Sequence, residues 1–551
     1  MTSAWLTLLG GFGLLPFGIK TMSEALQALS GDRLRRMIGR VSDNPLHALG
    51  AGLLVSAISQ SASLTTVMVV SFVNAGLMTL WQAASVILGA NVGATVTAWL
   101  LALRLHETAL ALVGLGALAT LFGRSDDTKF SGEVALGVGL VFVALGWLET
   151  GLMALRESAL ATYLAHLGGR DPFTLVLTVV IGLAATVFVQ SSSTMIGVTM
   201  ALATVGLIKF DAAAALVIGA NVGSTMTTQR AAVGTTTDSQ RAALFHTLVN
   251  ALGALLFMLI FDRWLVLLDA LVPGSPQTVD SSGIHPWVAV HIALAHTTFN
   301  AALAALALPL LRPLLAVVGW AVGRGRAGRP ELRFLRPSMV EAPALAIEQC
   351  RLEVLNMAQI AAEALHVTRR LFDDVSSQGT ELRDRILKRE RTTDAMQHAI
   401  TVFMSRVMAG TLTRAQSEEI RALIRVADEI ESVADYCERL ANYRRRLLRE
   451  GIVLGDAALG ELQGYLDRTI AFYEEIVDRA RRNEIGWLHA IETKAQYLAD
   501  EADGLRDTNL HRLGAQRATP GEGIFFNDLL VAMRRIRNHA LNMAEAFLGQ
   551  K

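Results

Sequence analysis

Two polar clusters interrupt long apolar stretches of this chain. One reads "ISQSASLTTV" from Ile58, and the other reads "FVQSSSTMIG" from Phe188. Each is a glutamine followed by hydroxyl side chains, and neither contains a charged residue. A helix that starts at such a cluster offers unpaired N–H groups, the positive end of its dipole and serine hydroxyls, which together favour an anion. Neutral donors also suit reversible binding, because a buried bidentate arginine tends to hold an oxyanion tightly.

A single cluster of this kind has a second interpretation, since small polar residues in membrane helices also serve helix packing and bond back to their own backbone. Duplication argues against that interpretation. Gln60 and Gln190 differ by 130 positions, and so do Asn91 and Asn221, each of which lies in an identical "GANVG". This offset predicts a duplicated membrane unit around residues 45–103 and 175–233, as in many transporters.

The "GANVG" segments predict a second kind of chemistry. Their glycines predict breaks in otherwise good helices, and a break inside a membrane is tolerated only where it is packed in protein or lines a wet cavity. Exposed carbonyl groups and nearby asparagine and threonine side chains would supply hard oxygen ligands. A small cation such as sodium is the expected partner.

The elements that position these residues follow from composition. The chain has 551 residues, of which 52% are hydrophobic and 18% charged, and its mean hydropathy is +0.41. These values predict a membrane protein. Residues 45–103 carry no charge and are too many for one span, so we expect a re-entrant hairpin around Gln60 and then a full span. Residues 23–43 have the mixed pattern of an interfacial helix or a solvated loop helix. Apolar stretches of spanning length occur at 4–20, 82–103, 108–123, 132–155, 172–189, 211–229, 241–261 and 286–322.

The second half of the chain has a different character. From residue 341 onward, charged segments carry apolar residues at helical spacing, and breaks at Gly379, Gly410, Gly451, Asn483 and 514–521 predict about six helices in a soluble bundle. We therefore divide the chain into a membrane domain at 1–322, an Arg-rich linker at 323–340 and a bundle at 341–551. The linker arginines predict that the bundle is cytoplasmic.

Several function classes are disfavoured. The formal net charge is zero, which gives no basic surface for nucleic acid. No Ser/His/Asp set or phosphate-binding loop indicates an enzyme. Cys350 and Cys437 have no disulfide or zinc spacing around them. We interpret His246, His291 and His296 as lone histidines at membrane helix ends, at an interface or hydrogen-bonded.

The motifs resemble those of the type II sodium–phosphate cotransporter family, which carries a "QSSS" hairpin and a following "G-x-N-x-G" helix in each of two inverted repeats. The resemblance implies an all-α polytopic membrane protein with re-entrant hairpins, forming a homodimer that carries phosphate with sodium across a bacterial inner membrane. Ala62 departs from the pattern and removes one hydroxyl from the first copy. The phosphate ligands it implies are Gln60, Ser61, Ser63, Thr65, Gln190, Ser191, Ser192, Ser193 and Thr194, and the sodium ligands are Thr66, Asn91, Thr95, Asn221 and Thr225.

The bundle resembles the PhoU family, in which an acidic motif on the third and sixth helices binds metal. Here the third helix offers Asp428, Glu431 and Asp435 for a divalent or transition metal, although the same residues also fit a solvated face paired with arginines. On the sixth helix, Arg534 and Asn538 stand where acids are expected. This resemblance implies a regulatory domain that senses phosphate and contacts a phosphate-signalling protein.

Two other functions remain open. The same site would serve a phosphate exporter or a carrier of another small oxyanion. Alternatively, the chain would be a membrane-anchored regulator of phosphate homeostasis that acts through its bundle.

Overall fold

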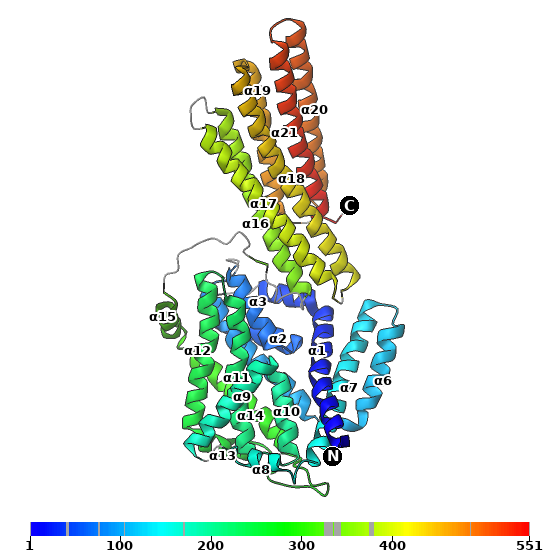
Figure 1. The fold of residues 1–551 in the computed structure, drawn as a ribbon, viewed down its shortest axis with the longest axis vertical. Helices are drawn as coiled ribbons and strands as arrows, with labels where there is room; N and C mark the ends of the chain where they lie inside the picture. Colours follow the sequence, from blue (N-terminus) through cyan, green and yellow to red (C-terminus); the bar gives the residue numbers. More distant parts are fainter. Residues whose placement is uncertain are drawn as a thin grey trace. The chain divides into compact units, whose positions relative to one another are not determined.

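The computed structural model describes residues 2–39, 43–74, 78–103, 105–168, 171–323, 334–335, 343–373, 379–410, 412–484 and 486–549. These residues form helices joined by short connections, without strands (Figure 1). The chain divides into two compact units, Met1–Gly328 and Arg329–Lys551. The arginines of the linker at 323–340 lie outside the described residues.

The first unit contains fifteen helices in its described part. In chain order they are α1 (Thr2–Gly39), α2 (Pro45–Ser59), α3 (Ala62–Asn74), α4 (Leu80–Gly93), α5 (Thr95–Ala102), α6 (His106–Phe122), α7 (Asp126–Met153), α8 (Ala159–Ala165), α9 (Pro172–Val189), α10 (Ser192–Thr204), α11 (Phe210–Ala232), α12 (Thr237–Leu259), α13 (Phe261–Leu271), α14 (Val288–Ala307) and α15 (Leu311–Val322).

The predicted duplication is visible in the order of these helices. Helices α2 and α9 both begin with proline after a side-chain cap, from Asn44 and Asp171 respectively. Each is followed by a short turn, a 13-residue helix (α3 or α10) and then a longer helical segment. A 13-residue helix is about 20 Å long, which is less than the ~30 Å hydrocarbon core. The helical hairpins expected around both glutamines are therefore present.

The break predicted at "GANVG" is wrong in the second copy, where α11 runs through the motif without interruption. In the first copy α4 ends at Gly93, the last residue of the motif, and α5 begins at Thr95. The glycines serve close packing instead. A Cβ on Gly89 would lie 1.9 Å from the carbonyl oxygen of Leu49 on α2, and one on Gly219 would lie 2.0 Å from that of Val179 on α9. Only glycine lets these backbones approach so closely.

Six described helices are long and apolar enough to cross a membrane by length and composition. They are Ala4–Ser30, Leu80–Ala102, Asp126–Met153, Pro172–Val189, Thr237–Leu259 and Val288–Ala307. The expected span at 211–229 is not among them, because the polar end of α11 lowers its hydropathy. The second pass expected within 286–322 is also absent, because α15 has only 12 residues. Residues 23–39 continue α1 rather than forming a separate interfacial helix.

The second unit has six helices in its described part, as the break positions predict (Figure 1). They are α16 (Pro343–Asp373), α17 (Gly379–Met408), α18 (Arg414–Glu450), α19 (Asp456–Arg481), α20 (Leu488–Gly514) and α21 (Pro520–Phe547). Capping boxes start α18 at Thr413 and α21 at Thr519, and Gly451 ends α18 in the left-handed conformation. Both cysteines are buried and unpaired, and burial raises the pKa of the Cys437 thiol to about 12.

Candidate functional site

The two glutamine clusters form equivalent turns between helices. Helix α2 ends at Ser59 and α3 begins at Ala62, whereas α9 ends at Val189 and α10 begins at Ser192. Gln60 has φ of 54° and Gln190 has φ of 59°, a left-handed region that residues other than glycine seldom adopt. A sparsely populated conformation kept at two equivalent positions requires support from its surroundings, which is a common feature of binding sites.

A serine caps the short helix that follows each turn. The Leu64 N–H donates to Ser61 Oγ at 3.2 Å, and the Thr194 N–H donates to Ser191 Oγ at 3.1 Å. In the second copy the Thr194 hydroxyl also donates to Ser191 Oγ, at 2.9 Å. The N–H groups that precede the capped one in each first turn have no intrahelical acceptor. Each turn therefore presents a positive helix end whose free donors suit an anion.

The remaining predicted phosphate ligands differ in exposure. Ser63, Ser192 and Ser193 are half-buried, as expected for side chains at a solvent-reachable site. Thr65 is fully buried, and its hydroxyl donates to the Ser61 carbonyl at 3.1 Å. Gln60 is half-buried and accepts a hydrogen bond from Thr97 at 2.8 Å, whereas Gln190 is exposed.

Each hairpin packs against the long helix of the other copy. Helix α3 contacts α11, and α10 contacts α5. No hydrogen bond between the described residues joins the two turns directly. The bond between Thr66 on α3 and Thr228 on α11, at 2.7 Å, links the first hairpin to the second copy. The structure thus brings the two copies together through their helices.

Four of the predicted sodium ligands lie on the helical segments that follow the hairpins, and the fifth, Thr66, lies on α3. The hydroxyls of Thr95 and Thr225 donate to carbonyl groups of their own helices, each at 2.8 Å. A hydroxyl that donates its hydrogen keeps oxygen lone pairs for a cation. Asn91 and Asn221 are buried, and each has its side-chain oxygen beside a histidine.

His246 and His296 do not lie at helix ends, contrary to our interpretation of the sequence. His246 lies near the middle of α12 and His296 near the middle of α14, with 1% and 3% of their surface exposed. His246 Nε2 is 3.0 Å from Asn91 Oδ1, and His296 Nε2 is 3.2 Å from Asn221 Oδ1. The hydrogen bonding we expected is present. His291 is in the first turn of α14, where its Nδ1 lies 2.8 Å from the Trp287 carbonyl oxygen.

Sequence reasoning missed these histidines as partners of the asparagines. The signal was a second repeat, because α12 and α14 share the pattern H-T-x-x-N at 246–250 and 296–300. In both helices the asparagine four residues later donates to the carbonyl of its histidine, at 2.9 Å. This pattern lies outside the offset of 130 that aligned the two hairpins.

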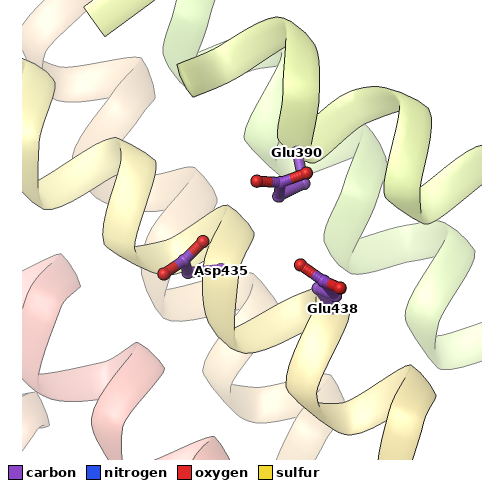
Figure 2. A group of neighbouring side chains, drawn as sticks. All are labelled: Glu390, Asp435 and Glu438. Atoms are coloured by element: carbon purple, nitrogen blue, oxygen red, sulfur yellow. The ribbon is translucent and has the colours of Figure 1, made fainter.

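In the second unit, three carboxylates gather on α17 and α18. Glu390, Asp435 and Glu438 point toward one another (Figure 2), and each offers an oxygen within 4.8 Å of the others. Asp435 was predicted, whereas the other two were missed. The available signal was Glu390-x-x-x-Asp394 on α17, which has the same spacing as Glu431-x-x-x-Asp435 on α18.

The other two predicted metal ligands lie outside this carboxylate triplet. Asp428 accepts a hydrogen bond from Gln397 Nε2 at 2.6 Å. Partial burial, followed by the charges of Asp435 and Asp394, raises the pKa of the Glu431 carboxyl. On α21, Arg534 donates to Asp503 at 3.0 Å, so a cationic side chain stands where an acid was expected.

Family models match residues in both units of the chain. The Na+/Pi-cotransporter family matches residues 14–150 and 147–271, once for each copy, and the PhoU domain matches residues 354–443. No solved structure matches the chain.

Named relatives cover the chain to different extents. "Putative inorganic phosphate export protein YjbB" of Salmonella typhimurium is 26% identical over 87% of this chain and 86% of its own length. "Uncharacterized protein YqeW" of Bacillus subtilis is 28% identical over 48% of this chain and 84% of its own. "Sodium-dependent phosphate transport protein 2A" of Rattus norvegicus is 33% identical over 29% of this chain and 22% of its own.

The relatives with a named function are phosphate transport proteins and not enzymes. Together with six apolar helices of spanning length, these matches indicate a multi-pass membrane protein. Much of the first unit is therefore similar to the Na+/Pi-cotransporter family, and residues 354–443 are similar to the PhoU domain.

Proposed function

We propose that this protein carries inorganic phosphate together with sodium across a bacterial inner membrane. The observation that carries the proposal is the pair of equivalent turns, each with a left-handed glutamine and a serine-capped helix start. Two such starts offer neutral donors to one small oxyanion. The phosphate ligands are the accessible donors of these turns, on Ser61, Ser63 and 191–193.

Sodium binds beside the phosphate in this proposal. Asn91, Thr95, Asn221 and Thr225 supply oxygen atoms from the helical segments that follow the hairpins, and Thr66 supplies one from the first hairpin itself. A cation that enters with the anion also supplies energy, since one charge moved down a 100 mV potential yields ~2.3 kcal/mol. The relative named as sodium-dependent supports coupling.

Binding of phosphate to the purified full chain tests the site. Isothermal titration calorimetry should show that phosphate binds more tightly when sodium replaces choline. Arsenate should compete with phosphate, because its shape and charge are close to those of phosphate. Sulfate should compete weakly. Equal binding of sulfate and phosphate would point to a carrier of another oxyanion.

For the second unit, we propose a cytoplasmic regulatory role. This unit binds a divalent or transition metal and contacts a phosphate-signalling protein. The metal ligands are Glu390, Asp435 and Glu438, whose oxygens converge. Manganese should raise the unfolding temperature of the full chain, and Asp435→Asn should abolish that rise. Asp428→Asn should preserve it, because Asp428 lies outside the triplet. Loss of the rise in both variants would favour the set predicted from the sequence, which is Asp428, Glu431 and Asp435.

Assembly as a homodimer completes the proposal, as the family resemblance implies. Cross-linking of the full chain in native membranes should trap a dimer. A band at monomer mass at every cross-linker concentration would contradict it.

Net export is the second candidate, favoured by a specific observation. The relative that matches 87% of this chain is named as an export protein. Cells loaded with labelled phosphate should then lose it faster when they produce this protein. Faster gain of label, dependent on external sodium, would favour uptake.

A further inference from the structure

A buried chain of four polar side chains connects the first hairpin to Asn91. Thr66 on α3 lies 2.7 Å from Thr228 on α11, Thr228 lies 3.1 Å from His246 Nδ1 on α12, and His246 Nε2 lies 3.0 Å from Asn91 Oδ1 on α4. All four side chains are at least nine-tenths buried. At its other end, the Thr66 hydroxyl reaches the carbonyl oxygen of Ser63, at 3.0 Å, in the first turn of α3.

The hydrogens of this chain fit two arrangements. Thr66 and Thr228 each have one hydroxyl hydrogen, and a neutral imidazole has one N–H. If His246 Nε2 donates to the Asn91 oxygen, then Nδ1 must accept from Thr228, and Thr228 must accept from Thr66. In that arrangement Thr66 has no hydrogen left for the Ser63 carbonyl.

The reverse arrangement uses the same number of hydrogens. Thr66 donates to the Ser63 carbonyl, Thr228 donates to Thr66, and His246 Nδ1–H donates to Thr228. The Nε2 atom then accepts, so the Asn91 amide must turn its nitrogen toward the histidine. Its oxygen then faces away from the ring.

Asn91 has an amide atom available for a ligand in both arrangements. With the oxygen toward His246, the Asn91 Nδ2 atom is buried and has no hydrogen-bond partner. With the amide reversed, its oxygen takes that position instead. A cation requires an oxygen there, so cation binding selects the arrangement in which Thr66 donates to Ser63.

The second copy has no equivalent chain. At the offset of 130, Ile196 corresponds to Thr66 and Ala98 corresponds to Thr228. His296 Nδ1 accordingly has no hydrogen-bond partner. Asn221 Oδ1 lies 3.2 Å from His296 Nε2 and accepts a hydrogen bond from Asn300 Nδ2 at 3.0 Å. These two contacts fix the orientation of the Asn221 amide.

We propose that the chain Thr66–Thr228–His246–Asn91 couples cation binding at Asn91 to the anion-binding turn of the first hairpin, with His246 as a positioning residue. The two arrangements form a two-state element that both ligands bias, which is the physical requirement for coupling between sites. A cation fixes the orientation of the Asn91 amide. The hydrogen bonds of this chain then require Thr66 to donate to the Ser63 carbonyl in the first turn of α3. This inference rests on the proposed sodium-coupled phosphate transport.

Thr228→Val tests the coupling, because valine has nearly the same shape and no hydroxyl. Phosphate uptake into proteoliposomes that contain the full-length protein is measured at low and at high sodium. The phosphate half-saturation constant at low sodium is divided by the constant at high sodium, and this ratio is compared between wild type and variant. Coupling between sites typically changes affinity by about 5-fold or more. We expect this ratio to fall toward one in Thr228→Val, whereas Thr228→Ser keeps the hydroxyl and the wild-type ratio.

Thr199→Val is the matched control. Thr199 is buried, and its hydroxyl donates to the Met195 carbonyl of its own helix at 2.8 Å. This control should keep the wild-type ratio. If Thr228→Val does not fold, Thr228→Ala removes the same hydroxyl with a smaller side chain and should give the same loss of coupling.

Two results overturn the inference alone: a wild-type ratio in Thr228→Val, or equal loss in Thr228→Val and Thr228→Ser, which indicates a packing role. Wild-type uptake that ignores sodium overturns the proposed function itself, and the inference with it.

Discussion

At the scale of single residues, the candidate anion site depends on backbone N–H groups at the start of α3 and α10. Gln60 and Gln190 adopt left-handed φ values, so that the chain reverses within two residues and the next helix starts at a serine cap. The absence of lysine and arginine from both clusters leaves dipoles and hydroxyls to hold the anion. The sequence was sufficient to predict this pair of turns.

The two turns are unequal, and serine substitutions should reveal it. Ser191 accepts two hydrogen bonds, and Ser61 accepts one in the corresponding turn. Replacing a capping serine by alanine costs about 1 kcal/mol of helix stability, and it also removes a hydroxyl that we assign to the anion. We expect Ser191→Ala to raise the half-saturation constant for phosphate more than Ser61→Ala. Equal effects would contradict the expected inequality between the two turns.

The histidine–asparagine pairs could not be predicted at this scale by aligning the hairpins. They belong to the pattern H-T-x-x-N on helices that follow the second copy. Only the packing of α12 on α4, and of α14 on α11, shows which asparagine each histidine meets.

At the scale of elements, glycine positions determine how closely the helices pack. Helices α2 and α4 touch through Gly52 and Gly89, where added Cβ atoms would lie 2.1 and 1.9 Å from backbone oxygens. The second copy repeats this contact through Gly182 and Gly219. We misread the "GANVG" glycines as breaks because a glycine inside a helix has the same sequence signature whether it bends the helix or admits a neighbour.

A pair of glycine substitutions on these helices tests the packing. Gly89→Ala should lower the unfolding temperature of the full chain in detergent, because overpacking costs about 1–3 kcal/mol. Gly50→Ala, on α2, is the matched control, since an added Cβ there meets nothing within 4 Å. A similar fall in both variants would indicate that helix flexibility, and not close approach, explains the glycines.

The acidic faces of α17 and α18 make a prediction about pH. Burial, and then neighbouring carboxylates, raises the pKa of Glu390 and Glu431 above 4.5. The stability that these groups contribute is therefore fully present below pH 4.5 and is lost as pH rises through their raised pKa values. Without metal, Glu431→Gln should raise the unfolding temperature at pH 7 and leave it nearly unchanged at pH 4. A variant less stable than wild type at pH 7 would contradict this electrostatic argument.

The bundle helices were predictable because their ends are marked locally. Threonine capping boxes at Thr413 and Thr519 and a glycine at position 451 carry the boundary information in the sequence. The carboxylates of the triplet were not predictable in the same way. Glu390 comes from a different helix, and only packing brings it to Asp435.

At the scale of the whole molecule, we propose that transport and regulation belong to different units of the chain. The cotransporter family matches within the first unit, and the PhoU domain matches within the second. Deletion of residues 341–551 should leave sodium-dependent phosphate transport in place but remove its response to the phosphate status of the cell. Loss of transport with the deletion, together with normal transport in Ser191→Ala, would favour the membrane-anchored regulator.

The central claim is tested most directly by phosphate accumulation in proteoliposomes that contain the full chain. With an inward sodium gradient, wild type should concentrate labelled phosphate above the external level, and Ser191→Ala should require more phosphate for the same rate. Collapse of the sodium gradient should end accumulation. Accumulation that is unchanged when the sodium gradient is abolished would contradict the account.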